Sequence, residues 1–205
     1  MDGVMGHAAM AATAVRYLRS VGAPVGVERY EALPPPVLRA VAEDERPPVA
    51  AGEFRRVLGH FASGVTVVTA VDEDGPAGFA CQSFASLSLE PPLVVFMVGR
   101  ASTTWPRIAR AGRFCVNVLG EEQDGLCRGF AVSGADKFAR VTHRPAPATG
   151  SPLLDGVVAW IDCTVQAVHT GGDHLIVVGH VEALGAEEDR VPLLFHRGRF
   201  GRFDV

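Results

Sequence analysis

Residues 157–184, VVAWIDCTVQAVHTGGDHLIVVGHVEAL, carry the clearest structural pattern in the chain. Apolar and polar side chains alternate from Ile161 to Ala167, and a period of two indicates a β-strand. The tetrapeptide TGGD (170–173) is a turn signal between strands, and residues 174–184 suit the return strand. We therefore expect a long antiparallel hairpin in which Asp162 lies on the polar face.

Other apolar segments predict further strands at residues 64–71, 77–88, 93–98 and 114–119, with closing strands in PLLF (192–195) and RGRFGRF (197–203). Helical spacing or helix-end signals predict helices at 53–61, 103–112 and 121–131. The chain is thus expected to be mostly β, with about seven strands, since long hairpins with few helices favour a barrel over a doubly wound sheet.

The first fifty residues differ from the rest in composition. They contain three consecutive prolines and an acidic cluster, with short helices expected at 7–20 and 36–44. We interpret residues 1–50 as an arm or linker and residues 51–205 as the folded domain.

Composition excludes several classes of protein. The 205 residues are 48% hydrophobic and carry 19 basic against 23 acidic side chains, a net charge of −4, which argues against nucleic-acid binding through bulk charge. No apolar run is long enough for a transmembrane helix, and no signal-peptide pattern is present. The four cysteines form no C-x-x-C pair, so reduced, buried thiols in a cytoplasmic protein are expected.

The stretch GFACQSFASLSLEPP (78–92) gathers Gln82 and several serines beside small residues. Side-chain hydroxyls and exposed backbone amides at a strand edge can hydrogen-bond a flat heterocycle that carries carbonyls and ring nitrogens. The alternative interpretation of this stretch is an ordinary edge strand with polar outward faces.

Three further features are weaker as bare patterns. RASTTW (100–105) places hydroxyls before a predicted helix, where Ser102 can cap the helix or contribute to an anion site. Lys137 is the single lysine among 19 basic residues, and His174 begins the predicted return strand. The spacing of His169, His174 and His180 matches no metal motif, so we expect no metal site.

Familiar catalytic motifs are missing from the sequence. There is no G-x-S-x-G, H-E-x-x-H or G-x-x-x-x-G-K-[ST] motif, and no G-x-G-x-x-G follows a predicted strand. A dinucleotide would therefore have to bind without a Rossmann loop.

Residues 53–203 resemble the short-chain flavin reductases, the reductase components of two-component flavin-dependent monooxygenases. The resemblance is carried in order by FRRVLGHFASGVTVVTA, GFACQSFASLSLEPPLVVF, STTWPRIARAGRFCVNVL, DKFARV, SPLLDGVVAWIDCTV, GGDHLIVVGHV and PLLFHRGRFGRF. It implies a split β-barrel homodimer that binds FMN or FAD, oxidises NADH or NADPH, and supplies reduced flavin to a separate oxygenase.

The resemblance also implies the residues of the site. The flavin ring would lie along Gly78, Phe79, Ala80, Gln82 and Ser83, and its ribityl and phosphate groups would meet Ser102, Thr103 and Thr104. Arg128, Lys137, Phe138 and Phe200 would complete the flavin site, and His174 would orient the nicotinamide.

This chain departs from the family pattern in three places. Many relatives have Thr-x-Ser-Ser-Phe at residues 80–84, where this chain has Ala-Cys-Gln-Ser-Phe. Relatives often have an arginine at the position of Gly129, and moving it to Arg128 rotates it by about 100° around a helix. The extension 1–50 lies outside the usual domain.

Two alternatives to a reductase remain open at the level of sequence. One is a flavin-binding module that does not turn over. The other is a tailoring oxidoreductase that retains its flavin and acts on an organic substrate.

Overall fold

The structure is a computed structural model and describes residues 49–134 and 136–203. The chain divides between Gly59 and His60, and helix α2 (Ala51–Leu58) lies before this division. Within α2, Phe54, Val57 and Leu58 are exposed. The helices expected at 7–20 and 36–44 lie outside the described residues.

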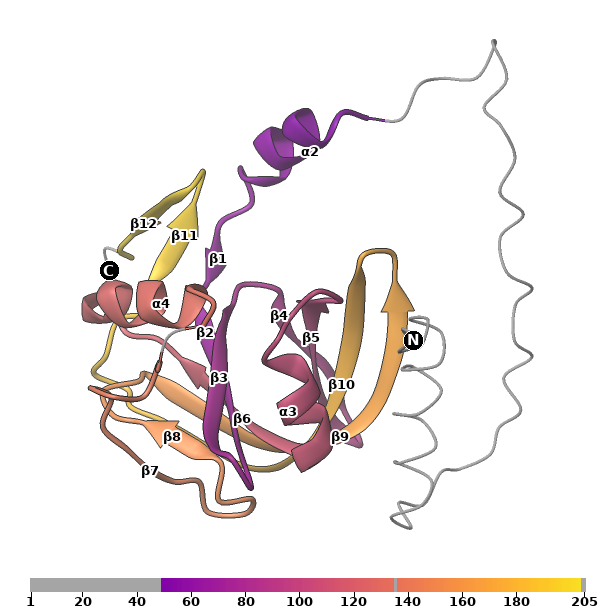
Figure 1. Cartoon of the computed structure of the whole chain (residues 1–205). Helices are drawn as coiled ribbons and strands as arrows, with labels where there is room; N and C mark the ends of the chain where they lie inside the picture. Colours follow the sequence, from indigo (N-terminus) through magenta and orange to yellow (C-terminus); the bar gives the residue numbers. More distant parts are fainter. Residues whose placement is uncertain (1–48, 135, 204–205) are drawn as a thin grey trace. The chain divides into compact units, whose positions relative to one another are not determined.

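The body that follows His60 is built on one antiparallel seven-stranded sheet (Figure 1). Its strands, in spatial order, are β3 (Gly75–Cys81), β2 (Thr66–Asp72), β6 (Arg113–Val118), β9 (Ala159–Gly171), β10 (His174–Ala186), β5 (Pro92–Gly99) and β4 (Phe84–Leu89). The hairpin expected from residues 157–184 is the β9–β10 pair, which turns at Gly172 and Asp173.

The two outer strands of this sheet, β3 and β4, are neighbours in the chain. Only Gln82 and Ser83 separate them, and Ser83 ties the bend to β5: its hydroxyl donates to the Met97 carbonyl (2.9 Å), while its carbonyl accepts from the Met97 N–H (3.2 Å). The chain itself thus joins the edges of the sheet. With structural relatives among the flavin reductases, this confirms the mostly β, split-barrel fold.

Two hydrophobic cores lie on opposite faces of the central strands. Inside the barrel, Phe96 and Phe114 pack edge to face with ring centroids 5.2 Å apart. A Cβ on Gly179 would lie only 2.4 Å from the Phe114 ring, so the large aromatic needs glycine opposite it. The other core includes Val67 and Phe130. Because β2 is buried on both faces, its sequence TVVTAVD is mostly apolar and β-branched and does not alternate.

Short elements cover this framework. Helix α3 (Trp105–Ala111) packs on β2 and β6, while α4 (Asp124–Ala131), preceded by the 3-10 turn η1 (Glu121–Gln123), packs on β3 and β2 (Figure 1). Two small sheets complete the body: β7 (His143–Pro145) with β8 (Pro152–Leu154), and β1 (Ser63–Gly64) with β11 (Leu194–His196) and β12 (Arg199–Gly201).

The structure differs from the sequence-based expectation in three places. The single strand expected at 77–88 is two strands, because the chain bends at Gln82 and Ser83. The β7–β8 pair lies in a stretch expected to be a loop. Asp162 is fully buried rather than solvated, since the backbone N–H groups of Ala148 (2.8 Å) and Thr149 (3.0 Å) donate to its carboxylate.

Candidate functional site

A pocket of about 690 Å³ opens between three segments of the body. One wall is the β2–β3 hairpin, which contributes Asp74 and residues 76–78. The second is the start of α3 with the two residues before it, and the third is the segment that ends at His143. Five of the residues predicted from the family resemblance line this pocket: Gly78, Thr103, Thr104, Lys137 and Phe138.

Lys137, on the third wall, connects that wall to the β2–β3 hairpin and to α4. Its ammonium Nζ donates to the carbonyl of Gly78 on β3 (3.1 Å) and to the carbonyl of Phe130 at the end of α4 (3.0 Å). Burial lowers the pKa of Lys137. A lysine ammonium has three N–H donors, so one remains for a group in the pocket.

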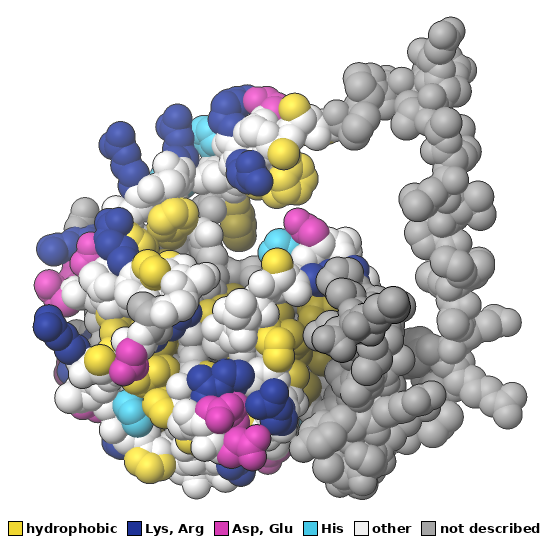
Figure 2. Space-filling model, in the orientation of Figure 1, with side chains coloured by type: hydrophobic (Ala, Val, Ile, Leu, Met, Phe, Trp, Pro, Cys, Tyr) yellow, Lys and Arg dark blue, Asp and Glu magenta, His cyan; other side chains and the backbone are white. Residues whose placement is uncertain are grey.

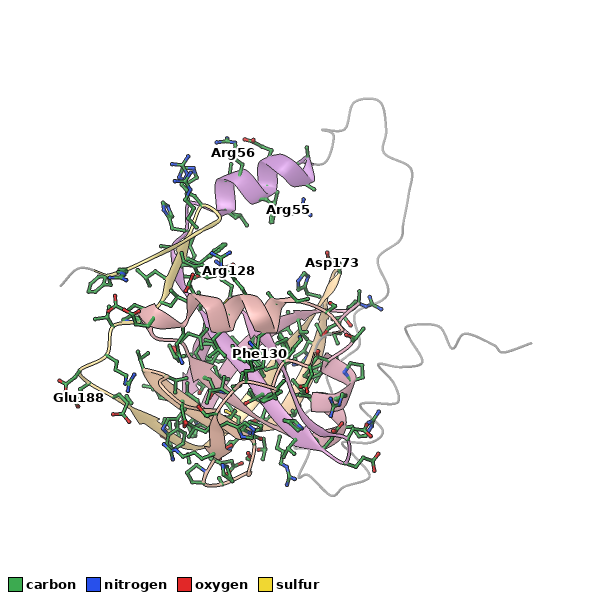
Figure 3. All side chains as sticks on the ribbon, turned by 60° about the vertical axis from the view of Figure 1, so that its left-hand side comes forward. Arg55, Arg56, Arg128, Phe130, Asp173 and Glu188 are labelled. Carbon is green, nitrogen blue, oxygen red and sulfur yellow. The ribbon has the colours of Figure 1, made fainter. Side chains whose placement is uncertain are left out.

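Phe138 gives the pocket an apolar surface. Its ring packs edge to face on Phe130 (centroids 5.1 Å apart) and on His143 (5.5 Å). Phe130 is a buried residue of α4 that points into the body from the helix (Figure 3), and its ring holds Phe138 in place.

Gly78 brings the backbone of β3 close to α4. A Cβ at this position would lie 2.9 Å from Cε1 of Phe130 and 3.0 Å from the carbonyl oxygen of Val68. No larger residue fits there without movement of its neighbours, so the glycine sets the spacing between the strand and the helix.

The hydroxyl residues before α3 have different roles. Ser102 accepts a hydrogen bond from the backbone N–H of Trp105 (3.2 Å), as a capping residue does, although Thr104 is the residue at the helix boundary. Thr104 makes no capping bond with its side chain. Both threonines line the pocket, and Thr103 is exposed there.

The rest of the predicted strand points away from the pocket. Phe79 packs in the barrel core against Phe96 (centroids 6.0 Å apart), and Ala80 packs against the other core. Gln82 is exposed at the bend, and the Ser83 hydroxyl is bonded to β5. None of these four described residues lines the pocket.

Arg128 and Phe200 meet each other outside the pocket. The Arg128 guanidinium carbon lies 4.9 Å from the centre of the Phe200 ring, and its Nε is 3.7 Å from Asp124. Arg128 and Phe130 project from opposite sides of α4 (Figure 3). The role of Arg128 in the flavin site stays a prediction.

His174 is the first residue of β10 and is half exposed. Its Nδ1 lies 2.8 Å from the carboxylate of Asp173, which stands at the hairpin tip in Figure 3. His174 pairs with Gly99, and the Arg100 N–H donates to the Asp173 carbonyl (2.9 Å). The hairpin is thereby tied to the segment that leads to Thr103, although His174 itself does not line the pocket.

The sequence did not predict the other residues that line the pocket, among them Asp74, Arg107 and His143. The segments DEDG and TTWPRIARAG predicted a turn and a helix, and nothing in either pattern indicates that the two lie side by side. In the part of the chain that the structure describes, no three His, Cys, Asp or Glu residues gather as metal ligands. None of the described helices has the length and apolar character that a membrane span needs.

Comparison with known proteins identifies relatives over most of the chain. The profile of the flavin reductase like domain matches residues 58–204. A flavin reductase of Pseudomonas putida is 48% identical over 166 residues, covering 80% of this chain and 97% of the relative. The reductase subunit HsaB of a flavin-dependent monooxygenase from Mycobacterium tuberculosis (strain ATCC 25618 / H37Rv) is 53% identical over 150 residues, covering 72% and 79%.

A solved structure extends the likeness to three dimensions. The NADH:FAD oxidoreductase SgcE6 of Streptomyces globisporus, in complex with NAD and FAD fragments, superimposes with a TM-score of 0.72 at 38% identity. The match covers 75% of this chain and 92% of that one. By sequence and by fold, the chain belongs to the flavin reductase like domain family.

Proposed function

We propose that this NAD(P)H-dependent flavin reductase binds its flavin in the pocket between the β2–β3 hairpin, the start of α3 and the segment that ends at His143. The observation that carries this placement is Lys137, a half-buried cation that crosses from Gly78 to Phe130 at the pocket wall. The reduced flavin serves a separate monooxygenase, as in the relatives named as reductase subunits.

The residues present fit a flavin. The volume of about 690 Å³ lies within the range of small-molecule and cofactor sites. Phe138 offers an apolar surface for a flat ring, while the hydroxyls of Thr103 and Thr104 and the Lys137 ammonium suit carbonyl and phosphate oxygens. Gly78 leaves the strand without a side chain at the pocket wall.

A bound flavin supplies the hydride acceptor for the nicotinamide, so the chain needs no nucleophile or metal of its own. Lys137 holds β3 and α4 at a fixed separation and keeps one N–H for the ligand. Thr103 and Thr104 would donate hydrogen bonds to oxygens of the flavin, and Phe138 would exclude water from one face of its ring. These contributions are binding and orientation, which supply the proximity that hydride transfer requires.

The remaining predicted residues extend the proposal. Phe79, Ala80, Gln82 and Ser83 would contribute to the flavin site through the backbone of β3 and the bend after it, since two of their side chains pack in the cores. Arg128 and Phe200 would cover the site as a stacked pair.

His174 would orient the nicotinamide from the tip of the β9–β10 hairpin. We expect His174→Ala to lower kcat/KM for NADH by about 5- to 150-fold, the loss of an orienting hydrogen bond, while flavin affinity changes little. Steady-state kinetics and flavin titration measure the two effects separately. Unchanged kcat/KM for NADH would remove His174 from the site.

The assembly and location are part of the same proposal. A homodimer follows from the family resemblance. A cytoplasmic location accords with four cysteines that are all free and buried.

The decisive experiment is a steady-state assay of the purified protein with NADH or NADPH and added FMN or FAD, in air. We expect nicotinamide oxidation that depends on flavin and needs no organic substrate. Flavin binding without turnover would instead support a non-reductase module. Flavin that co-purifies and is reduced only when an organic substrate is present would support a tailoring oxidoreductase.

A further inference from the structure

We infer that Arg107 is a positioning residue of the flavin pocket: through Asp72 and the β2–β3 hairpin it holds two pocket walls together, rather than binding flavin phosphate through its own charge. This inference rests on the proposed flavin site. Arg107 is a cation that lines the pocket, so direct phosphate binding is the obvious competing role.

The guanidinium of Arg107 is already engaged within the protein. Its Nε donates to the Asp72 carboxylate (3.0 Å), and its Nη2 donates to the second Asp72 oxygen and to the Gly75 carbonyl (2.9 Å). Its Nη1 donates to the Pro76 carbonyl (3.4 Å). Four contacts occupy four of the five N–H groups of an arginine.

The surroundings of Asp72 favour its pairing with this arginine. Its side chain is only 5% exposed, and one of its oxygens also accepts the backbone N–H of Asp74 (3.1 Å). The hydrogen bond from Arg107 lowers the pKa of Asp72, so the carboxylate stays charged at neutral pH. In Figure 2 a group of acidic and basic side chains lies together near the lower edge of the described body.

The contacts of Arg107 connect two of the three pocket walls, the start of α3 and the β2–β3 hairpin. Arg107 is in the first turn of α3, three residues after Thr104, and its own backbone N–H donates to the Thr104 carbonyl (3.1 Å). Its partners Gly75 and Pro76 lie a few residues before Gly78 on β3. The ion pair therefore sets the distance between the threonine hydroxyls and the strand.

The two roles predict different responses to the loss of phosphate from the ligand. A positioning residue determines the shape of the pocket, so its replacement lowers the affinities for FMN and for riboflavin by the same factor. Replacing a residue that binds the phosphate lowers the affinity for FMN alone, because riboflavin has the same ring and ribityl chain without the phosphate.

The test is equilibrium titration of flavin-free protein with FMN and with riboflavin, followed by flavin fluorescence. We expect Arg107→Lys, which keeps the charge but loses the bidentate geometry, to raise both Kd values about 10-fold. We expect Asp72→Asn to do the same. A loss confined to FMN, no loss at all, or tighter FMN binding in Asp72→Asn would each overturn the inference.

Arg110→Gln is the matched control. Arg110 lies one turn further along α3 and reaches Asp72 at 3.6 Å, but it does not line the pocket. We expect its Kd values to stay within about twofold of wild type, as for exposed ion pairs. Asp72→Asn decides the case if Arg107→Lys does not fold, since it changes charge without changing shape.

Hydrogen exchange of the flavin-free variants gives a readout independent of any ligand. The amides around Thr104 and Gly75 should exchange faster in Arg107→Lys than in wild type, and unchanged exchange would count against a positioning role.

Variants of Gly78 and Lys137 separate this inference from the site itself. If these leave flavin affinity unchanged, the proposed pocket is wrong; if they weaken it while Arg107→Lys does not, only the positioning role is wrong.

Discussion

Gly78 shows how a single residue determines the proposed site. Its missing side chain lets β3 approach α4, and its carbonyl accepts the Lys137 ammonium (3.1 Å). The same residue therefore provides close packing on one side and an anchor for the cation on the other. The backbone at this point serves the pocket more directly than the side chains of the following residues, Phe79 and Ala80, which face the two cores.

We expect Gly78→Ala to destabilise the fold by about 1–3 kcal/mol through overpacking against Phe130, and to weaken flavin binding at the same time. Gly129→Ala on α4 is the control, because nothing lies within 4 Å of its Cβ position. That variant should gain about 0.5–1 kcal/mol from helix propensity. Denaturant unfolding measures both, and equal stabilities for the two variants would contradict the packing argument.

The pairing of Asp72 also makes stability depend on pH. Because its folded pKa is lowered, its contribution is fully present above the unfolded pKa of about 4 and is lost as pH falls through the folded value. We expect Asp72→Asn to lower the melting temperature at pH 6 and to show a shallower decline than wild type on acidification below pH 4. Asp74→Asn, at a side chain that is 68% exposed, is the control and should follow the wild-type curve.

Among the elements, the loop before β8 is held by one buried group on β9. The carboxylate of Asp162 accepts hydrogen bonds from the N–H groups of Ala148 and Thr149 and from the Thr149 hydroxyl. The Thr149 hydroxyl oxygen in turn lies 2.8 Å from the Ser151 hydroxyl, from which it can accept. A loop rich in proline and glycine thus gains a fixed conformation from a single side chain of the barrel.

We expect Asp162→Ala to cost about 3 kcal/mol or more, because it leaves buried donors without an acceptor. Thr164→Val, two residues further along β9, removes only a hydroxyl that donates an exposed hydrogen bond to the Glu182 carboxylate. This variant should change the free energy of unfolding by less than about 1 kcal/mol. Thermal unfolding of the two variants compares them. Similar losses would show that the loop does not depend on Asp162.

The elements also show which features the sequence could predict. The β9–β10 hairpin was predicted correctly because its period of two extends over many residues. The strand β5 was predicted from a continuous apolar run, and β2 from β-branched residues followed by a turn. The bend at Gln82 was missed because residues 77–88 contain no proline, asparagine or aspartate that would indicate a turn within them. The β7–β8 pair was missed because its strands are three residues long and contain prolines.

For the site, local motifs could place Gly78, Thr103 and Lys137 in order along the chain but not in space. Arg107 and His143 were missed because their relevance comes from tertiary contacts between segments far apart in the sequence. Asp162 was expected on a solvated face, since alternation along one strand does not show that a distant loop covers that face.

At the scale of the whole molecule, the boundary of the domain is a separate question from its fold. The family profile begins at residue 58 and the contacts divide the chain after Gly59, whereas the change in composition lies near residue 51. The role of residues 1–50 as an arm stays a prediction.

We expect a truncated protein that begins at Ala51 to fold and to reduce flavin like the full chain, because residues 1–50 carry no strand-like alternation and contain three consecutive prolines. Full-length protein is the control in measurements of melting temperature, oligomeric state and NADH:FMN activity. A melting temperature lower by more than several degrees, or a change of oligomeric state, would place the arm within the folded core.

The hydrogen bond from Lys137 to the Gly78 carbonyl of β3 has a consequence for solubility. As the outermost strand of the sheet order, β3 is a surface on which a strand of another molecule could add, and edge strands commonly prevent this with a charged lysine. By occupying the Gly78 carbonyl, Lys137 blocks one of the hydrogen bonds that such an intermolecular ladder would need. Burial lowers the pKa of Lys137, so its positive charge is lost at a lower pH than that of an exposed lysine, while its hydrogen bond to Gly78 needs only an N–H group.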